Sequence, residues 1–287
     1  MDKKQENKGR LKCIAAATAF VLFVLVFVWT KEYDKGTDDS YDIVFLGDSN
    51  FDNVRDETGI ASIVASKTGK NVLNGAFGGS MMGNLYGRKT EYQSALSMHN
   101  LAVSICNRNF GVQKSAIDAL SRTDYSGNFH TTLDSLSDVD FSAVDILVVE
   151  HGVNDYLAGT PIKNGVDLYD TTTFCGALRT VIEMLRASYP DLRIVLVTPA
   201  FCAPIQKDGM AHLCTENTYG GGYLEAYVTA ELEVAKDMDV DIIDLYHGLD
   251  INADNFSDYL YDGLHYNDEG RKMVADVIAD YLMGEVE

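Results

Sequence analysis

Short runs of apolar residues alternate, from Tyr41 onward, with longer segments in which apolar residues recur at helical spacing. Five runs are short enough to be strands: 43–46, 72–73, 146–149, 194–197 and 240–245. Four longer segments place apolar residues three or four positions apart: 60–69, 174–185, 224–235 and 274–282. That spacing is typical of helices that bury one face. Strands that alternate with helices predict an α/β domain, in which helices cover both faces of a parallel sheet.

The segment from Ser80 to Val144 interrupts this alternation. It contains helical patches at 92–106 and 112–120 and a polar piece, and we interpret it as a helical crossover and cap. Asn267 is a candidate N-cap for the last helix. No internal repeat and no second domain is indicated. Ligands of open α/β sheets bind beyond the carboxyl ends of the strands, so the residues directly after each strand are the candidates for chemistry.

An uncharged apolar run, residues 13–30, precedes the α/β region. At about 1.5 Å per residue it spans roughly 27 Å, close to the hydrocarbon thickness of a bilayer. The run does not end in a small-residue cleavage site, which favours an uncleaved single-pass anchor; a cleaved signal peptide is the alternative. Residues 1–12 carry a net charge of +3, which predicts a cytoplasmic tail and an extracellular domain. Residues 31–40 are polar and predict a tether to a domain at 41–287.

Charge and cysteine content limit the partners of the chain. Of its 287 residues, 43 are Asp or Glu and 23 are Lys or Arg, for a net charge of −20. Such an acidic chain repels phosphate backbones, so no nucleic-acid partner is expected, and nothing indicates a protein partner. The five cysteines form no CxxC pair, which argues against a zinc site. Cys202 and Cys214 are equally compatible with a disulfide in an oxidising compartment and with free thiols.

Four short motifs follow predicted strands: GDSN at 47–50, NGAFGGS at 74–80, GVND at 152–155 and DGLH at 262–265. Ser49, on a tight strand-to-helix turn, is a candidate nucleophile. Asn154 is a neutral donor for a developing oxyanion. Asp262 precedes His265 by three residues and can hold the imidazole so that its Nε2 acts as a base. Taken singly, each motif is also typical of an ordinary turn, a helix cap or a surface pair.

Together and in this order, the motifs resemble those of the SGNH hydrolases, also called GDSL esterases and lipases, over about residues 41–285. The resemblance implies a three-layer flavodoxin-like fold with five parallel strands. It also implies that Ser49 is the nucleophile, that His265 is the general base and that Asp262 is its partner. The oxyanion hole implied by the resemblance consists of the Ser49 N–H, the Gly79 N–H and the Asn154 side chain.

Three positions qualify this resemblance. Gly75 and Gly78 also lie in the second motif, but the family usually places its glycine five residues after the Asn of that motif, which favours Gly79. Asn50 replaces the usual Leu after the nucleophile, which weakens the match of the first motif slightly; the position takes no part in the chemistry, and the change can alter the pocket wall. His151 precedes the third motif, and we interpret it as a structural or pocket-lining residue because it has no carboxylate at a suitable spacing.

These residues predict ester hydrolysis in two steps, without a metal or an organic cofactor. An anchored external enzyme meets acylated glycans, so the expected substrates are acyl esters, in particular acetyl esters, of carbohydrate or cell-wall glycans or of small molecules. A lipase, a lysophospholipase, an acyltransferase and a catalytically silent tethered binding module are the alternatives. Segments 48–59 and 250–261 begin like calcium loops but lack Gly at the sixth position and Glu at the twelfth.

Overall fold

The structure is a computed structural model that describes residues 40–83, 91–120 and 126–284. The predicted tail at 1–12, the predicted anchor at 13–30 and all of the predicted tether except Ser40 lie outside these ranges. Within the described ranges, no helix combines the length and the apolar character that crossing a membrane requires.

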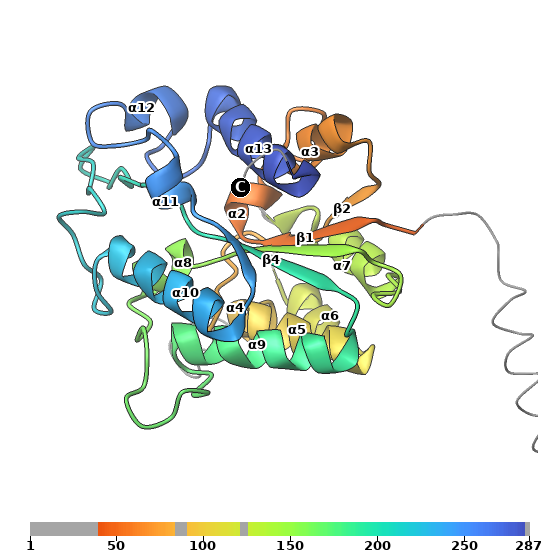
Figure 1. Cartoon of the computed structure of the whole chain (residues 1–287). Coiled ribbons are helices and arrows are strands. Elements are labelled where there is room, and N and C mark those ends of the chain that lie inside the picture. Colours follow the sequence, from red (N-terminus) through yellow and green to blue (C-terminus); the bar gives the residue numbers. More distant parts are fainter. Residues whose placement is uncertain (1–39, 84–90, 121–125, 285–287) are drawn as a thin grey trace, which may run out of the picture. The chain divides into compact units, whose positions relative to one another are not determined.

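A single sheet of five parallel strands forms the centre of the described domain (Figure 1). The strands are β1 (Ile43–Gly47), β2 (Val72–Asn74), β3 (Ile146–Glu150), β4 (Arg193–Val197) and β5 (Asp241–Ile243). Their order in the sheet is β2-β1-β3-β4-β5, and all neighbouring pairs are parallel. The predicted flavodoxin-like sheet is therefore confirmed. Every residue of β1 is buried, which explains its unbroken apolar sequence, since helices cover both faces of the sheet.

The chain reverses its direction of travel across the sheet at β1. From β1 it moves outward to β2, and it then crosses back over β1 to reach β3. Loops that leave neighbouring strands in opposite directions open a crevice at this point, where doubly wound sheets bind ligands. In the register of the two strands, Gly47 at the end of β1 lies opposite Glu150 at the end of β3. Ser49 and Asn154 follow these two residues, so both begin beside the crevice.

Helices form a layer on each face of the sheet (Figure 1). On one face α3 (Ile60–Thr68) packs against α13 (Asp268–Met283). On the other face α9 (Phe174–Ser188) packs against both α5 (Met98–Asn107) and α10 (Leu224–Met238). The remaining helices are short: α2 (Ser49–Asp52), α4 (Glu91–Ala95), α6 (Gly111–Asp118), α7 (Phe129–Ser137), α8 (Val153–Ala158), α11 (Leu245–Gly248) and α12 (Phe256–Tyr259).

Several helix boundaries follow from capping residues. Asn267 accepts the backbone N–H of Gly270 at 3.0 Å and begins α13, as predicted. The predicted helix at 92–106 is instead two helices, because Ser97 caps a new helix by accepting the backbone N–H of Asn100. The predicted fifth strand ends early, at Ile243, since Asp244 caps α11.

The segment from Ser80 to Val144 differs from the prediction in one respect. It does cross from β2 to β3, but its helix α5 packs beside α9 in a layer that covers the sheet. In its described part it therefore supplies core-forming surface in addition to any capping role.

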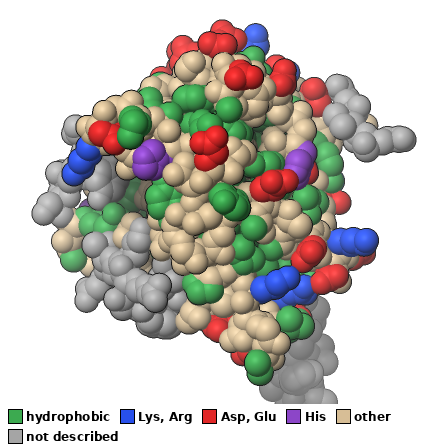
Figure 2. All heavy atoms as spheres, turned by 90° about the vertical axis from the view of Figure 1, so that its left-hand side faces the viewer, with side chains coloured by type: hydrophobic (Ala, Val, Ile, Leu, Met, Phe, Trp, Pro, Cys, Tyr) green, Lys and Arg blue, Asp and Glu red, His purple; other side chains and the backbone are tan. Residues whose placement is uncertain are grey.

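The carboxyl ends of the strands face the viewer in Figure 2. Acidic side chains are spread among hydrophobic ones on this face of the domain.

Candidate active site

Ser49, His265 and Asp262 form a continuous chain of hydrogen bonds. The Ser49 Oγ lies 2.9 Å from the His265 Nε2. The His265 Nδ1 lies 2.7 Å from the Asp262 Oδ2. The structure thus brings together all three residues of the predicted triad, although Ser49 and His265 are 216 positions apart.

The loop that carries Asp262 and His265 is fixed by its own backbone. The Asp262 Oδ1 accepts the backbone N–H groups of Leu264 at 3.0 Å and His265 at 2.8 Å. Gly263 has φ +78°, and a Cβ there would lie 1.9 Å from the carbonyl oxygen of Ala203. Only glycine satisfies both the left-handed backbone and this close approach. The spacing of Asp262 and His265 is therefore held by the fold and does not depend on side-chain contacts alone.

Electrostatics define the tautomer of His265. Partial burial of Asp262 opposes its ionisation, but hydrogen bonds from the His265 side chain and from the backbone N–H groups of His265 and Leu264 help to lower the pKa of the carboxyl. An ionised carboxylate accepts the Nδ1–H, so the Nε2 is left as the acceptor for the Ser49 hydroxyl proton. The Tyr261 ring stacks on the imidazole, with 5.7 Å between ring centroids. The imidazole is thus held both at its Nδ1 edge and on one of its faces.

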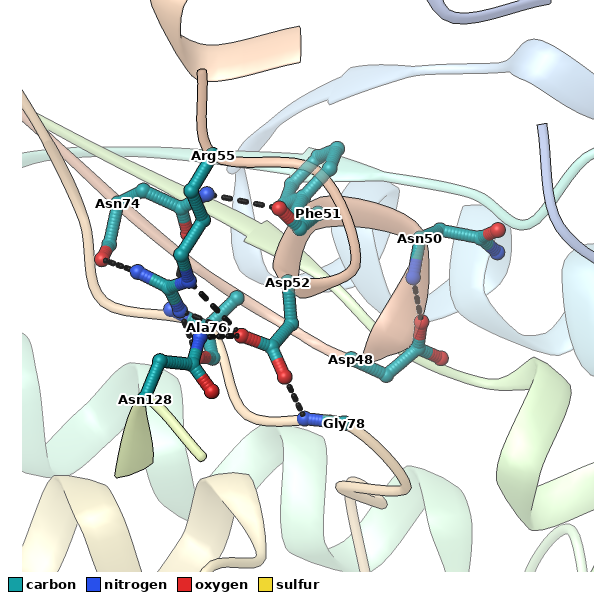
Figure 3. Close-up of polar contacts among 9 residues, drawn as sticks. All are labelled: Asp48, Asn50, Phe51, Asp52, Arg55, Asn74, Ala76, Gly78 and Asn128. Carbon is teal, nitrogen blue, oxygen red and sulfur yellow. Dashed lines mark hydrogen bonds and ion pairs between the residues drawn. The ribbon is translucent and has the colours of Figure 1, made fainter. Parts of the chain in front are cut away.

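Asp48, which sequence reasoning missed, connects the first and third motifs. Its side chain is fully buried, accepts the backbone N–H of Asn50 at 2.9 Å and so caps α2 (Figure 3). Its second oxygen accepts the Asn154 Nδ2 at 2.9 Å. Burial raises the pKa of Asp48 to about 6. One N–H of the Asn154 amide is thereby used, and the other can donate to a substrate. The N-cap position beside Ser49 was the available sequence signal for Asp48.

The three glycines of the second motif differ in what their amides do. The Gly75 N–H donates to the Phe45 carbonyl at 2.8 Å, and the Gly78 N–H donates to the Asp52 Oδ2 at 2.8 Å. Within the described ranges, the amides of Gly79 and Ser49 have no protein acceptor. Gly79 also has φ +75°, a backbone conformation that suits glycine. This arrangement supports the prediction that Gly79, and neither Gly75 nor Gly78, supplies the loop amide of an oxyanion hole.

His151 is fully buried and pairs with Ser80, whereas the nucleophile's hydroxyl pairs with His265. The His151 Nε2 is 3.0 Å from the Ser80 Oγ, which itself donates to the Leu96 carbonyl at 2.7 Å. The single hydroxyl proton of Ser80 is thereby used, so the His151 Nε2–H must be the donor. Burial lowers the pKa of His151 to about 3, which keeps the ring neutral. These contacts fit the structural role predicted for His151.

Asp155, the last residue of the third motif, is a second feature that sequence reasoning missed. It is fully buried and accepts the backbone N–H groups of Met82 at 2.8 Å and Gly83 at 3.2 Å. Burial raises the pKa of Asp155 to about 7. Its carboxyl fastens the loop that follows Gly79 to α8, and an acidic residue directly after Asn154 was the sequence signal for it.

Neither a metal centre nor a disulfide forms in the described ranges. No group of three His, Cys, Asp or Glu side chains within them is arranged to hold a metal ion. Cys202 and Cys214 are free thiols, and the backbone N–H of Cys202 points to the Cys214 Sγ at 3.5 Å. Of the two states that the sequence left open, the structure has the reduced one.

Known proteins share both the sequence pattern and the fold. The sequence model of the GDSL-like lipase/acylhydrolase family matches residues 45–273. The isoamyl acetate-hydrolyzing esterase 1 homolog of Bos taurus is 31% identical over 106 residues, which cover 35% of this chain and 41% of that protein. The homolog of the same name from Mus musculus is 33% identical over 100 residues, which cover 34% of this chain and 40% of that protein. This chain thus spans less than half the length of these relatives.

Solved structures extend the similarity to most of the domain. A possible lipase from Chitinophaga pinensis superposes with a TM-score of 0.56 at 20% identity, covering 85% of this chain and 98% of that one. A carbohydrate acetylesterase from Sinorhizobium meliloti superposes with a TM-score of 0.52 at 13% identity, covering 85% and 99% of the two chains. At these identities the likeness concerns the fold. The family match over residues 45–273 establishes that the chain belongs to the GDSL-like lipase/acylhydrolase family, a family of ester hydrolases, as its four motifs predict.

Proposed function

We propose that the chain is a membrane-anchored extracellular serine esterase that removes acyl groups, in particular acetyl groups, from carbohydrate or cell-wall glycans. The observation that carries the proposal is the hydrogen-bonded chain from the Ser49 Oγ through His265 to Asp262. A serine becomes a nucleophile when an adjacent base takes its proton and a third group orients that base.

In the first step the His265 Nε2 takes the Ser49 proton while the Oγ attacks the carbonyl carbon of the ester. The Asp262 carboxylate stabilises the imidazolium that forms. The tetrahedral intermediate carries a negative charge on the former carbonyl oxygen. When the intermediate collapses, His265 gives its proton to the leaving alcohol, and the acyl group remains on Ser49.

The oxyanion hole consists, in this proposal, of the Ser49 N–H, the Gly79 N–H and the free N–H of the Asn154 side chain. Asp48 holds the Asn154 amide through the other N–H, which orients the donor before the substrate arrives. Donors that are already oriented need no reorganisation when the charge develops, and this accounts for the large effect of such groups.

In the second step water takes the place of the alcohol. His265 removes a proton from the water as it attacks the acyl carbon, and the same oxyanion donors hold the second tetrahedral intermediate. The proton returns to the Ser49 Oγ as the carboxylic acid leaves. This chemistry uses only groups of the chain and water.

The preference for short acyl groups is supported by the relatives. The two curated relatives are named for hydrolysing isoamyl acetate, an acetate ester. The carbohydrate part of the proposal follows from the predicted location: an enzyme held at the outer face of a membrane meets acylated glycans. The apolar run at 13–30 and the basic residues before it support that location.

The catalytic proposal is tested with the full-length protein in mild detergent. Turnover of p-nitrophenyl acetate is measured for the wild type, Ser49→Ala and His265→Ala, with butyrate, octanoate and palmitate esters as a chain-length series. Turnover of acetate that both substitutions reduce to background supports the proposal, and a preference for palmitate points to a lipase. If the wild type is folded but inert, and a fluorophosphonate probe does not label it, the catalytic proposal fails. A non-catalytic binding module is then the remaining function.

Substrate and location need separate measurements. Acetate released from acetylated xylan or acetylated peptidoglycan tests the glycan assignment, while transfer of the acetyl group to an added sugar would identify an acyltransferase. For location, intact cells that express the full chain are treated with protease. The proposal requires that the catalytic domain is digested from outside and that alkaline carbonate does not extract the chain from membranes.

A further inference from the structure

Asp52 is a buried carboxylate that lies beside the proposed oxyanion hole and takes no part in the triad. Its exposed fraction is 3%, and it belongs to α2, the short helix that begins with Ser49. Its Oδ1 accepts hydrogen bonds from the Arg55 Nε at 2.9 Å, the Arg55 Nη2 at 2.6 Å and the Asn128 Nδ2 at 2.6 Å. Its Oδ2 accepts the Gly78 N–H at 2.8 Å (Figure 3). The carboxylate thus joins α2 to the loop that carries Gly79.

The loop lies directly against the nucleophile at this point. A Cβ on Gly78 would lie 3.1 Å from the Asp52 Oδ2 and 3.8 Å from the Ser49 Cβ. The Gly79 N–H belongs to the peptide group that follows Gly78. A hydrogen bond that fixes the Gly78 amide therefore also constrains the direction in which the Gly79 N–H points relative to the Ser49 side chain.

Arg55 fixes the same loop at its beginning. Its Nη1 donates to the Asn74 carbonyl at 2.8 Å and its Nη2 to the Ala76 carbonyl at 2.6 Å (Figure 3). It also places a positive charge next to the carboxylate. An unpaired carboxylate this close to a developing oxyanion would repel it, and the guanidinium offsets that repulsion. Arg55 therefore has two roles here, one geometric and one electrostatic.

The other side of Gly79 is held by a different contact. Ser80 follows Gly79 and is bonded to the buried His151 at 3.0 Å. Among the described residues, only a Gln93 side-chain atom lies within 4 Å of a Cβ built on Gly79. The loop is thus fastened on each side of Gly79, while Gly79 retains open space. This is the arrangement that a preoriented backbone donor requires.

We infer that Asp52, paired with Arg55, is a positioning residue of the oxyanion hole, which it serves by setting the Gly79 N–H against the Ser49 nucleophile. This inference rests on the proposed esterase function, since it concerns the same reaction. Asp52 does not touch the substrate. Its loss should lower kcat and weaken binding of a tetrahedral inhibitor, while binding of the ground-state ester is largely retained, because the oxyanion forms only after attack.

The test compares Asp52→Asn with a matched control in the full-length protein. Asp237→Asn removes another aspartate that binds an arginine, since the Arg179 Nη2 lies 2.6 Å from the Asp237 Oδ2 on the exposed side of the α9–α10 pair. For each variant kcat and KM on p-nitrophenyl acetate, the inhibition constant of phenylboronic acid and the melting temperature are measured. The boronate forms a tetrahedral adduct on the serine and places an oxygen where the oxyanion develops.

Asp52→Asn should lower kcat by about 10²-fold with KM within about two-fold, since small misplacements of catalytic groups have effects of this size. Affinity for phenylboronic acid should fall as well, and Asp237→Asn should match the wild type. An Asp52→Asn protein with unchanged kcat, or with equal losses in kcat and in substrate affinity, would overturn the inference. If Asp52→Asn does not fold, Arg55→Lys tests the inference instead, because lysine keeps the positive charge but cannot bond to both the Asn74 and the Ala76 carbonyls. Full activity of Arg55→Lys would then contradict the inference.

The two proposals can fail separately. If the wild type has no esterase activity that depends on Ser49, the proposed function fails. Suppose instead that the wild type is active, that Ser49→Ala is inactive and that Asp52→Asn is as active as the wild type. In that case only the positioning role of Asp52 fails.

Discussion

The Asn154 amide donates to the buried Asp48 carboxylate across 2.9 Å, and this bond joins the segments that follow β1 and β3. Asp48 is also the N-cap of the helix that begins with the nucleophile. One carboxylate therefore orients both Ser49, through α2, and the side-chain donor Asn154. The relative position of nucleophile and oxyanion donor is built into the switch point of the sheet.

Replacement of Asn154 by Ala should remove one oxyanion donor and leave the triad intact. We expect kcat on p-nitrophenyl acetate to fall by about 10²–10³-fold, with a small change in KM, as is typical of one lost donor. Asn71→Ala, at the opposite end of the sheet, is the control and should leave kcat unchanged. A loss in Asn154→Ala that appears only in KM would show that Asn154 binds substrate and does not stabilise the oxyanion.

Replacement of Gly79 by Ala should separate activity from stability. Gly79 has φ +75° and Gly209 has φ +82°; among the described residues, a Cβ built on Gly79 meets only a Gln93 side-chain atom at 3.7 Å, and one built on Gly209 meets nothing within 4 Å. Both substitutions should lower the free energy of unfolding by about 1–2 kcal/mol, the cost of a left-handed backbone with a side chain. Only Gly79→Ala should also lose turnover, because the strain turns its amide. Denaturant unfolding and ester hydrolysis measure the two effects, and equal activities of the two variants would refute the role of Gly79.

Replacement by glutamine should have different effects at His151 and at His265. The His151 ring only donates its Nε2–H to Ser80, and the amide of a glutamine can replace that donor. We therefore expect His151→Gln to keep activity within about ten-fold of the wild type, while His265→Gln falls to background because an amide cannot act as a general base. Initial rates at pH 7.5 measure both. An inactive, folded His151→Gln protein would show that His151 has a chemical role.

Asp155 should make the protein less stable as the pH rises. Burial raises the pKa of Asp155 from 3.8 to about 7 in the folded state. The folded protein thus keeps this proton up to about pH 7, whereas the unfolded chain releases it near pH 4. The contribution of Asp155 is favourable at low pH, is lost as the pH rises from about 4 to 7 and stays constant above that range. Asp48, whose pKa is about 6, acts in the same direction.

The measurement is urea unfolding of the wild type and Asp155→Asn at pH 5 and pH 8. His151, whose pKa is lowered to about 3, opposes the trend below pH 6.5, so the comparison uses the difference between the two proteins. The free energy of unfolding should fall from pH 5 to pH 8 by less in Asp155→Asn than in the wild type. One pKa unit corresponds to about 1.4 kcal/mol, so the expected difference is on the order of a few kcal/mol. Parallel changes in both proteins would show that Asp155 does not titrate in this range.

The sequence predicts those parts of the site that follow strands. Ser49, Asn154 and the pair Asp262–His265 each come soon after a predicted strand or precede the last helix, and one edge of a parallel sheet collects such residues. Helix α7 was missed although Phe129, Leu133 and Leu136 are spaced as on one helical face, because polar residues dominate the surrounding segment. The boundaries within 92–107 were missed because Ser97 continues the polar pattern of a helix while it caps a new one.

Contacts between side chains and distant backbone were not predictable from spacing. Asp52 and Gly78 are 26 positions apart, and nothing in the local pattern of either residue shows that they meet. The same is true of Asp155, which accepts the backbone N–H groups of Met82 and Gly83, 73 and 72 positions away. Sequence reasoning found residues with chemical side chains, whereas it missed acids whose function is to hold backbone amides in place.

Ser49 and His265 come from opposite ends of the domain, and the packing of α3 against α13 brings these ends together. The consequence concerns biosynthesis. A chain still attached to the ribosome has its nucleophile long before it has its base, because 216 positions separate the two residues. The bond between the Ser49 Oγ and the His265 Nε2 therefore forms only after both ends of the domain have been made. A product that stops before His265 has the serine but no base to activate it.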